Sequence, residues 1–440
     1  MDIAGKITLL RSSKLFRIFY STGATTAIKI LSTVLLSKLV AVQLGTAGLA
    51  LLGQLTNFIT IVLLLATGGF ANGIIKYVSE FAGTERVFGF IKQSFKLTLL
   101  IAAFTGAFIL IFSNVLSRWC FGTIQYNYIF MFLGVSNIFY ASTNYFTSLL
   151  NGLSDYRMFN RVNAINSIVS LVISATLIWV FGLKGAFLAV AINQSFSCLI
   201  IVFFARKYLH YFKGFANVIV EKGLVKNLFV FSVMALVTAL VVPATQMLIR
   251  RFLIDRLGMN AAGEWEAINR ISNLYLALLI NIMLVYYLPK LSAENSKLLL
   301  RREIRNGLMF FSPLVILMAL TLFLLRYFIV TTFLTSDFLS VQPFFLPQLV
   351  GDIFKILSFL FAYMVIAKRL TVFFIITEVV TNCLYLILSY HFIDRFGTIG
   401  PIYAYMLVFI LYFIVQLIFI GKIYLNENFT SNSWIWKGGR

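Results

Sequence analysis

Runs of apolar residues, each about 20 positions long, recur along the whole chain and are separated by short polar segments. An α-helix of this length crosses the hydrocarbon core of a bilayer. The runs lack the alternation of polar and apolar positions that marks membrane barrel strands, so helices are the predicted elements. Twelve spans are predicted, over residues 18–42, 49–75, 95–114, 129–150, 162–181, 183–204, 228–249, 265–288, 308–325, 345–366, 372–393 and 401–420.

The composition supports the same class of protein. Of the 440 residues, 60% are hydrophobic and 12% are charged, whereas about a quarter of the residues of a soluble domain are charged. A water-soluble globular domain is therefore excluded. Three cysteines and two histidines provide neither a disulfide framework nor a set of metal ligands at a recognisable spacing, so no metal and no cofactor are predicted.

The formal net charge of +21 has two explanations, nucleic-acid binding and membrane topology. With the N-terminus placed in the cytoplasm, 25 Lys and Arg residues fall in cytoplasmic segments and 7 in outside segments. This asymmetry follows the positive-inside rule, so a multi-pass membrane protein with both termini cytoplasmic is predicted, without a nucleic-acid partner. The outside set is Arg118, Lys184, Arg250, Arg251, Arg256, Arg326 and Arg395.

The longest cytoplasmic connection divides the spans into two groups of six. The predicted organisation is a cytoplasmic N-terminus (1–17), an N-lobe (18–205), a linker (206–227), a C-lobe (228–420) and a cytoplasmic tail (421–440). A weak internal sequence similarity supports the division, because Leu44-Gly45 after the first span resembles Leu257-Gly258 after the seventh span. Two six-helix bundles around a central cavity are typical of transporters.

Ionisable residues inside the predicted spans are candidates for a hydrated cavity, because each costs about 2.5–3.5 kcal/mol at the bilayer centre on insertion scales. Lys29 shares one helix face with the hydroxyl residues Thr22, Thr25, Thr26, Ser32 and Thr33. Lys38 lies on the opposite face near the outer end, where snorkelling to the surface explains it. Lys29 is therefore a predicted substrate-binding cation.

A second polar stripe follows the eighth span, where Glu266, Asn269, Arg270 and Asn273 are spaced by three and four residues and Asn281 extends the stripe. One interpretation is an ion pair of Glu266 and Arg270 that anchors the outer end of the helix. That interpretation leaves Asn273 and Asn281 unexplained. The other is a wet cavity in which Arg270 binds substrate and the two asparagines face sugars.

Three further charged residues lie in the tenth and eleventh spans. Asp352 and Lys355 share a helix face near the midplane, either as a structural pair that neutralises itself or as part of the cavity. Glu378 has no cation nearby in the sequence, so it pairs across helices or stays protonated. Lys355 is a predicted substrate-binding cation. Asp352, Glu378 and Glu266 are predicted charge partners, and Asp352 or Glu378 is a candidate for coupling to a proton or cation gradient.

Neutral polar residues also follow the fourth and fifth spans. On the fourth span they are Asn137, Tyr140, Asn144, Ser148 and Asn151. Some of these residues are expected to form interhelical hydrogen bonds. So many amide and hydroxyl groups would nevertheless suit a carbohydrate ligand, and Asn144 is a predicted sugar-facing residue. Nucleotide loops, nucleophile elbows and zinc motifs are absent from the sequence, so no catalytic residue is predicted and the chain is not expected to be an enzyme.

Several sequence runs resemble bacterial Wzx-type flippases, in the branch of O-antigen translocases that includes the lipid III flippase of enterobacterial common antigen. The resemblance covers about residues 20–420. It is carried by Lys29 to Lys38 followed by LVAVQLGTAGLALLGQ, then by GGFANGIIKYVSEF, YLPKLS, QLVGDIFK, YMVIAK and Glu378.

This resemblance implies the fold of the multidrug/oligosaccharidyl-lipid/polysaccharide (MOP) exporter superfamily, with Lys29, Arg270, Asp352, Lys355 and Glu378 in the cavity. It also implies that the chain lies in the bacterial inner membrane and moves an undecaprenyl-pyrophosphate-linked O-antigen-type oligosaccharide from its cytoplasmic to its periplasmic leaflet. The predicted partners are this lipid-linked substrate and the membrane lipids, with an O-antigen polymerase and a chain-length regulator as further candidates. Three alternatives stay open: a lipid III flippase, a drug or cation antiporter of the same superfamily, and a membrane glycosyltransferase or O-antigen polymerase.

Overall fold

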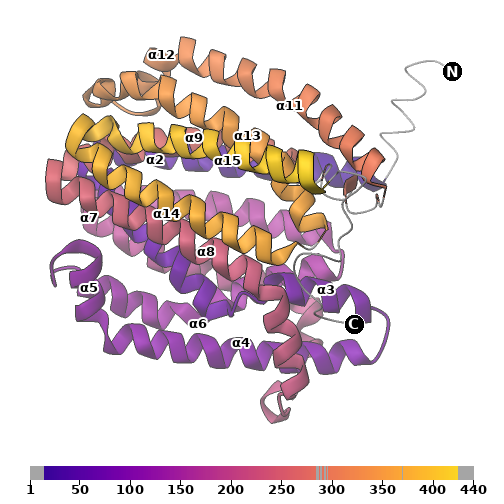
Figure 1. Cartoon of the computed structure of the whole chain (residues 1–440). Coiled ribbons are helices and arrows are strands. Elements are labelled where there is room, and N and C mark those ends of the chain that lie inside the picture. The colour runs from indigo at the N-terminus through magenta and orange to yellow at the C-terminus, as the bar shows by residue number, and fades with distance from the viewer. Residues whose placement is uncertain are drawn as a thin grey trace. The chain divides into compact units, whose positions relative to one another are not determined.

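The computed structural model describes residues 14–283, 287, 290, 291, 294, 296–368 and 370–424, and every regular element in these residues is a helix (Figure 1). Most of the predicted N-terminal segment and tail, residues 1–13 and 425–440, lies outside them. The main helices are α2 (Lys14–Thr67), α3 (Ala71–Phe81), α4 (Arg86–Ile111), α5 (Ser113–Phe121), α6 (Asn127–Gly152), α7 (Tyr156–Phe204), α8 (Lys222–Leu257), α9 (Met259–Ile282), α11 (Lys297–Leu324), α12 (Arg326–Phe333), α13 (Phe345–Ala367), α14 (Thr371–Phe396) and α15 (Gly400–Gln416). Short helical turns η1 (Arg206–Phe212), η2 (Phe215–Asn217), η4 (Ser336–Phe344), η5 (Gly397–Ile399) and η6 (Leu417–Tyr424) join or extend them.

Two of the helices are long because each contains two membrane crossings joined at a glycine. Gly45 in α2 has φ 61° and Gly182 in α7 has φ 56°, in the left-handed region that favours glycine. The two parts of α7 pack tightly, since a side chain at Gly185 would meet the carbonyl oxygen of Leu177 at 1.8 Å. These glycine corners separate the predicted spans 18–42 and 49–75, and 162–181 and 183–204.

Seven segments in the described chain are long and apolar enough to cross a membrane. Three of them are long enough for two predicted spans each: Thr25–Phe81 and Tyr156–Phe204, which bend at Gly45 and Gly182, and Thr371–Ile420, which contains α14 and α15. Counting these three twice and adding α6 and α9 accounts for all twelve predicted spans. Large apolar side chains cover the outer surface, and on α4 Phe104 and Ile111 are 75% and 76% exposed. Such surfaces are stable in lipid, so the predicted all-α membrane fold is confirmed.

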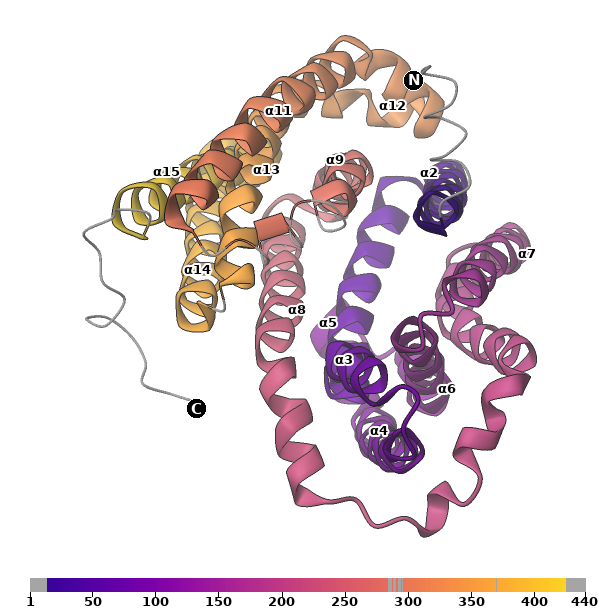
Figure 2. The same ribbon diagram turned by 90° about the vertical axis from the view of Figure 1, so that its right-hand side faces the viewer.

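The described residues form two compact units. Unit 1 comprises residues up to Leu44 together with Gln54–Ala239, and unit 2 comprises Gly45–Gly53 together with the residues from Leu240 onward. In unit 1, α6 packs against both α4 and α7, and Figure 2 shows α3, α4 and α6 nearly end-on as one group. In unit 2, α15 packs against both α13 and α14.

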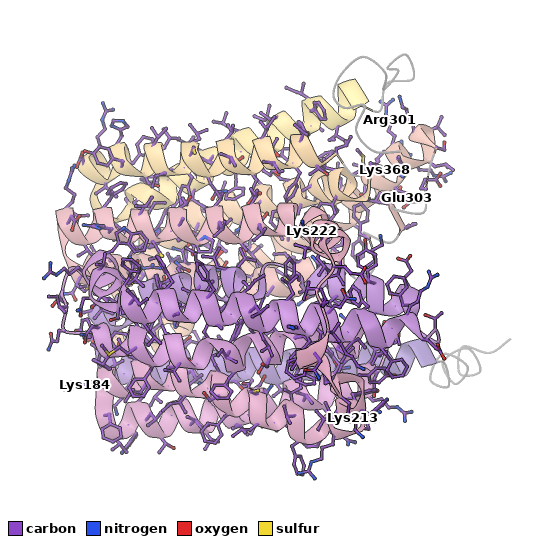
Figure 3. All side chains as sticks on the ribbon, turned by 90° about the horizontal axis from the view of Figure 1, so that it is seen from below. Lys184, Lys213, Lys222, Arg301, Glu303 and Lys368 are labelled. Atoms are coloured by element: carbon purple, nitrogen blue, oxygen red, sulfur yellow. The ribbon has the colours of Figure 1, made fainter. Side chains whose placement is uncertain are left out.

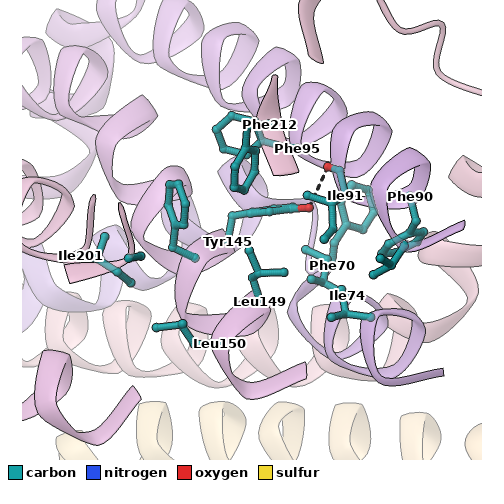
Figure 4. Packing of buried hydrophobic residues seen from close by; sticks show 14 of the residues in the cluster. Phe70, Ile74, Phe90, Ile91, Phe95, Tyr145, Leu149, Leu150, Ile201 and Phe212 are labelled. Carbon is teal, nitrogen blue, oxygen red and sulfur yellow. Dashed lines mark hydrogen bonds between the residues drawn. The ribbon is translucent and has the colours of Figure 1, made fainter. Parts of the chain in front are cut away.

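The core of unit 1 is an aromatic and aliphatic cluster around Tyr145 (Figure 4). The Tyr145 hydroxyl donates to the carbonyl oxygen of Ile91 at 2.9 Å, so the one polar atom of this side chain is satisfied inside the core. Phe95 packs edge-on against the Tyr145 ring with centroids 5.0 Å apart. Phe70 and Ile74, at the start of α3, are fully buried in the same cluster and thereby hold this helix in place.

The predicted linker, residues 206–227, belongs to unit 1 and packs against α4. The Lys96 ammonium donates to the carbonyl oxygens of Ala216 and Val218 at 2.7 and 2.8 Å. At the start of α7, the Asp155 carboxylate accepts from Lys207 and from the Tyr208 hydroxyl, both at 2.7 Å. It also accepts from the backbone N–H of Met158 and so caps the helix.

Burial by itself raises the pKa of the Asp155 carboxyl. The hydrogen bonds from Lys207, Tyr208 and the Met158 backbone together lower this pKa by more than burial raises it, so the pKa lies below its ordinary value. A carboxylate with a depressed pKa stabilises the fold above its unfolded pKa of about 3.9, and this contribution is lost as the pH falls through the folded pKa. We therefore expect Asp155→Asn to lower the melting temperature of the purified protein at pH 7, with a difference that shrinks as the pH is taken below about 4. The exposed carboxylate variant Glu85→Gln should melt like the wild type at both pH values, and an equal Asp155→Asn deficit at both would contradict the assignment.

Unit 2 contains residues 45–53 of α2 because they pack against α9. The Thr46 hydroxyl donates to the Asn260 side-chain oxygen at 2.7 Å. Gly263 faces the backbone of Thr46 so closely that a Cβ there would lie 2.0 Å from the Thr46 carbonyl oxygen. The glycine therefore permits the close approach of these two segments.

Charged residues lie at the ends of the helices. Lys184 is at one end of the unit 1 helices and Lys213 is at the other (Figure 3). The charge asymmetry of the sequence assigns these two lysines to opposite sides of the membrane, so their positions fit helices that span it. In unit 2, Arg301, Glu303 and Lys368 gather at one end.

Candidate functional site

A buried carboxylate organises the middle of unit 2. Asp352 on α13 is fully buried, and its oxygens accept hydrogen bonds from Ser272, Tyr275 and Tyr405, each at 2.7 Å. Gln348 adds a longer bond of 3.3 Å from one turn earlier on α13. A buried charge is tolerated when its lone pairs are satisfied in this way. Asp352 therefore joins α9, α13 and α15 inside the unit.

The residue before Asp352 explains how Tyr405 reaches it. A Cβ at Gly351 would lie 2.6 Å from the Tyr405 ring and 3.2 Å from the Met406 backbone. Since glycine has no side chain, α15 can approach α13 at this level, as small residues allow in membrane helix packing. The Gly351-Asp352 pair thus provides both the space and the acceptor for the tyrosine.

Lys355 lies one turn beyond Asp352 on α13 and is half-buried. Its ammonium sits 5.4 Å from the Tyr405 ring centroid and 5.1 Å from that of Phe409, at distances typical of cation–π contacts. It interacts electrostatically with Asp352 and with Glu378 on α14. Among the described residues, however, no carboxylate lies within 4 Å of it. The structure thus groups three of the predicted charged residues and shows no direct ion pair of the Lys355 ammonium within the part of the chain that it describes.

A second charged cluster is centred on Glu266 of α9. Its carboxylate accepts from Arg250 of α8 at 2.5 Å and from Arg270 at 2.9 Å. The Arg250 side chain is 1% exposed, and its guanidinium lies 5.3 Å from the Trp265 ring centroid. The Glu266 carboxylate also lies close to Gly53, because a Cβ added at Gly53 would lie 2.5 Å from the carboxylate carbon. This cluster carries one net positive charge, and both arginines are committed to it.

In unit 1, the predicted cation Lys29 lies on α2 with an exposed side chain. Thr33, also exposed, donates its hydroxyl to the Lys29 carbonyl oxygen at 2.8 Å. Ser32, from the same predicted stripe, is buried. The side chain of Thr22 lies outside the described residues. The exposed part of the stripe is therefore narrower than its sequence spacing suggests.

Asn144 lies in the wall of a cavity of about 250 Å³ within unit 1. Tyr140, one turn earlier on α6, shares a side-chain hydrogen bond with it. The described residues that line the cavity are Thr60, Leu63, Leu64, Thr67, Gly69, Ala71, Asn72, Tyr140, Asn144 and Ala239. Asn137, two turns before Asn144, serves a different purpose, because its amide donates to the Ala102 carbonyl oxygen and to Thr105 at 2.9 and 2.8 Å.

Two predicted asparagines and one unpredicted arginine lie on α9 and α8 of unit 2. Asn273 and Asn281 are exposed on α9, and their sugar-facing role stays a prediction. Arg250 was assigned to an outside segment from the sequence, but the structure buries it within α8. The sequence signal for this burial was the position of Arg250 at the very end of an apolar run. The hydroxyl donors to Asp352, which are Ser272, Tyr275 and Tyr405, could not be found from spacing because they come from α9 and α15.

Within the described residues, no three His, Cys, Asp or Glu side chains gather in a way that could hold a metal ion. The clusters found here are built from hydroxyl, amide, guanidinium, ammonium and carboxylate groups inside apolar helices. Such groups can bind and release a polar solute, which is the chemistry of a membrane transporter.

Comparison with known proteins defines the class. Residues 16–293 match the family of polysaccharide biosynthesis proteins, and because this is more than half of the chain, the chain belongs to that family. The fold is shared with solved transporters. The lipid II flippase MurJ in an inward closed conformation gives a TM-score of 0.72 at 15% identity, over 92% of this chain and 87% of MurJ. An inward-facing MATE multidrug transporter of the MOP superfamily gives 0.66 at 14% identity, over 92% and 96%.

Curated relatives extend the comparison. The lipid III flippase of Escherichia coli (strain K12) is 28% identical over 397 residues, which is 89% of this chain and 94% of that protein. The lipid III flippase of Shigella flexneri gives the same values. The predicted all-α membrane fold is thus the fold of these solved transporters, and the curated relatives are flippases.

Proposed function

We propose that this protein flips an undecaprenyl-pyrophosphate-linked oligosaccharide from the cytoplasmic to the periplasmic leaflet of a bacterial inner membrane by alternating access. Its membership of a polysaccharide biosynthesis family and its likeness to lipid III flippases support this proposal. The excess of basic residues in one set of connections supports cytoplasmic termini.

The observation that carries the proposal is the state of Lys355. An ammonium inside apolar helices, without a carboxylate within ion-pair distance among the described residues, is available to an anionic ligand. Lys355 in unit 2 is one lysine proposed to bind the diphosphate, and Lys29 in unit 1 is the other. Arg270 is a weaker candidate, because Glu266 already occupies its guanidinium.

Two glycans fit this proposal. The relatives support the lipid III of enterobacterial common antigen at least as well as an O-antigen repeat unit. An O-antigen polymerase and a chain-length regulator are proposed partners in the second case. Expression of the chain in Escherichia coli strains lacking either the lipid III flippase or an O-antigen flippase separates the two, since rescue is expected in the strain whose cargo it carries.

A drug or cation antiporter of the same superfamily is the rival function. The sequence disfavours it, because the first span contains lysines and no carboxylate. Coupling of the flippase to protons or another cation through Asp352 or Glu378 is part of the proposal.

We expect Lys29→Ala and Lys355→Ala each to prevent surface glycan assembly and to cause lipid-linked intermediates to accumulate, with unchanged protein levels. Losing one charge-assisted contact to a phosphate weakens binding by about 10- to 100-fold. The matched control is Lys184→Ala, which removes an exposed lysine at the end of the unit 1 helices. Gel analysis of surface glycans is the measurement, and normal glycan ladders in both lysine variants would remove the proposed diphosphate site.

A further inference from the structure

The second membrane crossing of unit 1 is interrupted. α2 ends at Thr67 and α3 begins at Ala71, inside the predicted span over 49–75. The turn between them contains Gly68 and Gly69, with φ values of 60° and 68° that favour glycine. Irregular backbone at membrane depth is tolerated where it is buried in protein or lines a hydrated cavity. Here Gly69 lines the cavity of unit 1.

The cavity has polar groups available on three of its sides. Asn72, in the first turn of α3, is exposed, and its side-chain amide has no hydrogen-bond partner among the described residues. Tyr140 and Asn144 contribute a phenol and a second amide from α6; these two side chains share one hydrogen bond, and the amide retains further donor and acceptor capacity. Thr60 and Thr67 complete the set from α2, and both hydroxyls already donate to their own helix, so their oxygens remain as acceptors.

None of the described residues that line this cavity carries a charge. A diphosphate would therefore meet no cation here. The N-terminus of α3 offers only about half an elementary charge, which is small against the two or more charges of a diphosphate. The N-terminus of α3 does offer backbone N–H donors. The N–H groups of a helix's first turn have no partner within the helix, and no side chain caps the N-terminus of α3. Donors and acceptors without net charge match hydroxyl and acetamido groups.

The size and rigidity of the cavity fit one part of a larger ligand. A volume of about 250 Å³ lies below the range of roughly 300–1,000 Å³ of complete ligand sites. The wall on the α3 side is held by Phe70 and Ile74, which are buried in the aromatic cluster of unit 1 (Figure 4). A wall that is fixed before the ligand arrives loses little entropy on binding.

We propose that the cavity at the α2–α3 break is a subsite for an uncharged sugar residue of the lipid-linked oligosaccharide, with Asn72 and Asn144 as its principal hydrogen-bonding residues and Tyr140 as part of its wall. This inference rests on the proposed flippase function and adds to it a binding site for the glycan that is chemically distinct from the lysines proposed for the diphosphate.

The test uses the purified full-length protein in lipid nanodiscs with two probes. One is undecaprenyl-pyrophosphate-linked oligosaccharide extracted from cells that lack the gene, and the other is undecaprenyl pyrophosphate without sugars. Asn72→Ala and Asn144→Ala should each weaken binding of the first probe by about three- to tenfold, as expected for the loss of a neutral hydrogen bond, and leave binding of the second unchanged. The matched control is Asn127→Ala, which removes an asparagine of the same helix, α6, whose amide bonds to Asn114 instead.

The outcomes separate this subsite from the wider proposal. If both asparagine variants bind the sugar-bearing probe with wild-type affinity, the subsite proposal is wrong. If the variants lose the same affinity for both probes, the proposal is also wrong, and the cavity is instead a diphosphate site. If the wild-type protein binds neither probe, the flippase proposal itself fails and the subsite fails with it. Asn72→Ala protects the test against misfolding, because this side chain is exposed and has no hydrogen-bond partner among the described residues.

Discussion

Replacing Asp352 with alanine is expected to destabilise unit 2 by about 3–5 kcal/mol, because removing one partner of a buried charged network leaves the others unsatisfied. Ser272, Tyr275 and Tyr405 would all lose their acceptor in the middle of the unit. Lys355 would at the same time lose one of its two electrostatic partners. Thermal unfolding in detergent is the measurement, and a fall in melting temperature of at least about 6 °C is expected for a unit of this size.

Two further variants make this result specific. Asp352→Asn retains an acceptor oxygen and nearly the same shape, so we expect a smaller loss of stability than with alanine. Asp337→Ala removes an exposed carboxylate of η4 in the same unit and should leave the melting temperature close to that of the wild type. If Asp352→Ala were as stable as Asp337→Ala, the network would not hold α9, α13 and α15 together.

Gly263→Ala is the second substitution with a large expected effect, and its sign is the informative part. In an ordinary helix interior, alanine is more stable than glycine by about 0.5–1 kcal/mol. At position 263, however, the added Cβ would lie 2.0 Å from the Thr46 carbonyl oxygen. Because the clashing atoms belong to the backbone, residues 45–53 must move away from α9, at a cost of about 1–3 kcal/mol or more.

The control for this prediction is Gly89→Ala in α4. Nothing lies within 4 Å of the position that its Cβ would take, so the intrinsic helix preference should decide and the variant should be slightly stabilised. We expect opposite signs in thermal unfolding, and loss of glycan export for Gly263→Ala but not for Gly89→Ala. A stabilised Gly263→Ala would show that α9 and the Thr46 segment are not packed as closely as described.

The sequence predicted the helices and their number because a membrane imposes a local rule. Each span must satisfy its own backbone hydrogen bonds and present apolar side chains to lipid, so its length and polarity are visible in a single run of residues. The positions of the corner glycines could be predicted in part, since Leu44-Gly45 and Leu257-Gly258 both end long apolar runs and have Gly φ values of 61° and 88°. The break at Gly68 and Gly69 could be suspected from the glycines alone, but not the cavity beside it.

The same local rule fails for side chains inside the bundles. Arg250 has the sequence position of an outer loop residue, yet it is buried and donates to the carboxylate of Glu266, 16 residues later in the chain. Asn137 and Asn144 share one face of α6, yet the first bonds to α4 and the second lines a cavity. Spacing on one helix shows that two residues share a face, but it does not show what the neighbouring helix presents to that face.

The chain by itself therefore determined the class of the protein, the twelve helical spans and the set of polar residues that require a partner inside the membrane. The tertiary structure decided which partner each residue has. Tyr405 reaches Asp352 from 53 residues away, and Arg270 shares the Glu266 carboxylate with Arg250. The physical reason is that hydrophobicity is a property of each segment, whereas a buried hydrogen bond or ion pair depends on the distance between two segments that only packing brings together.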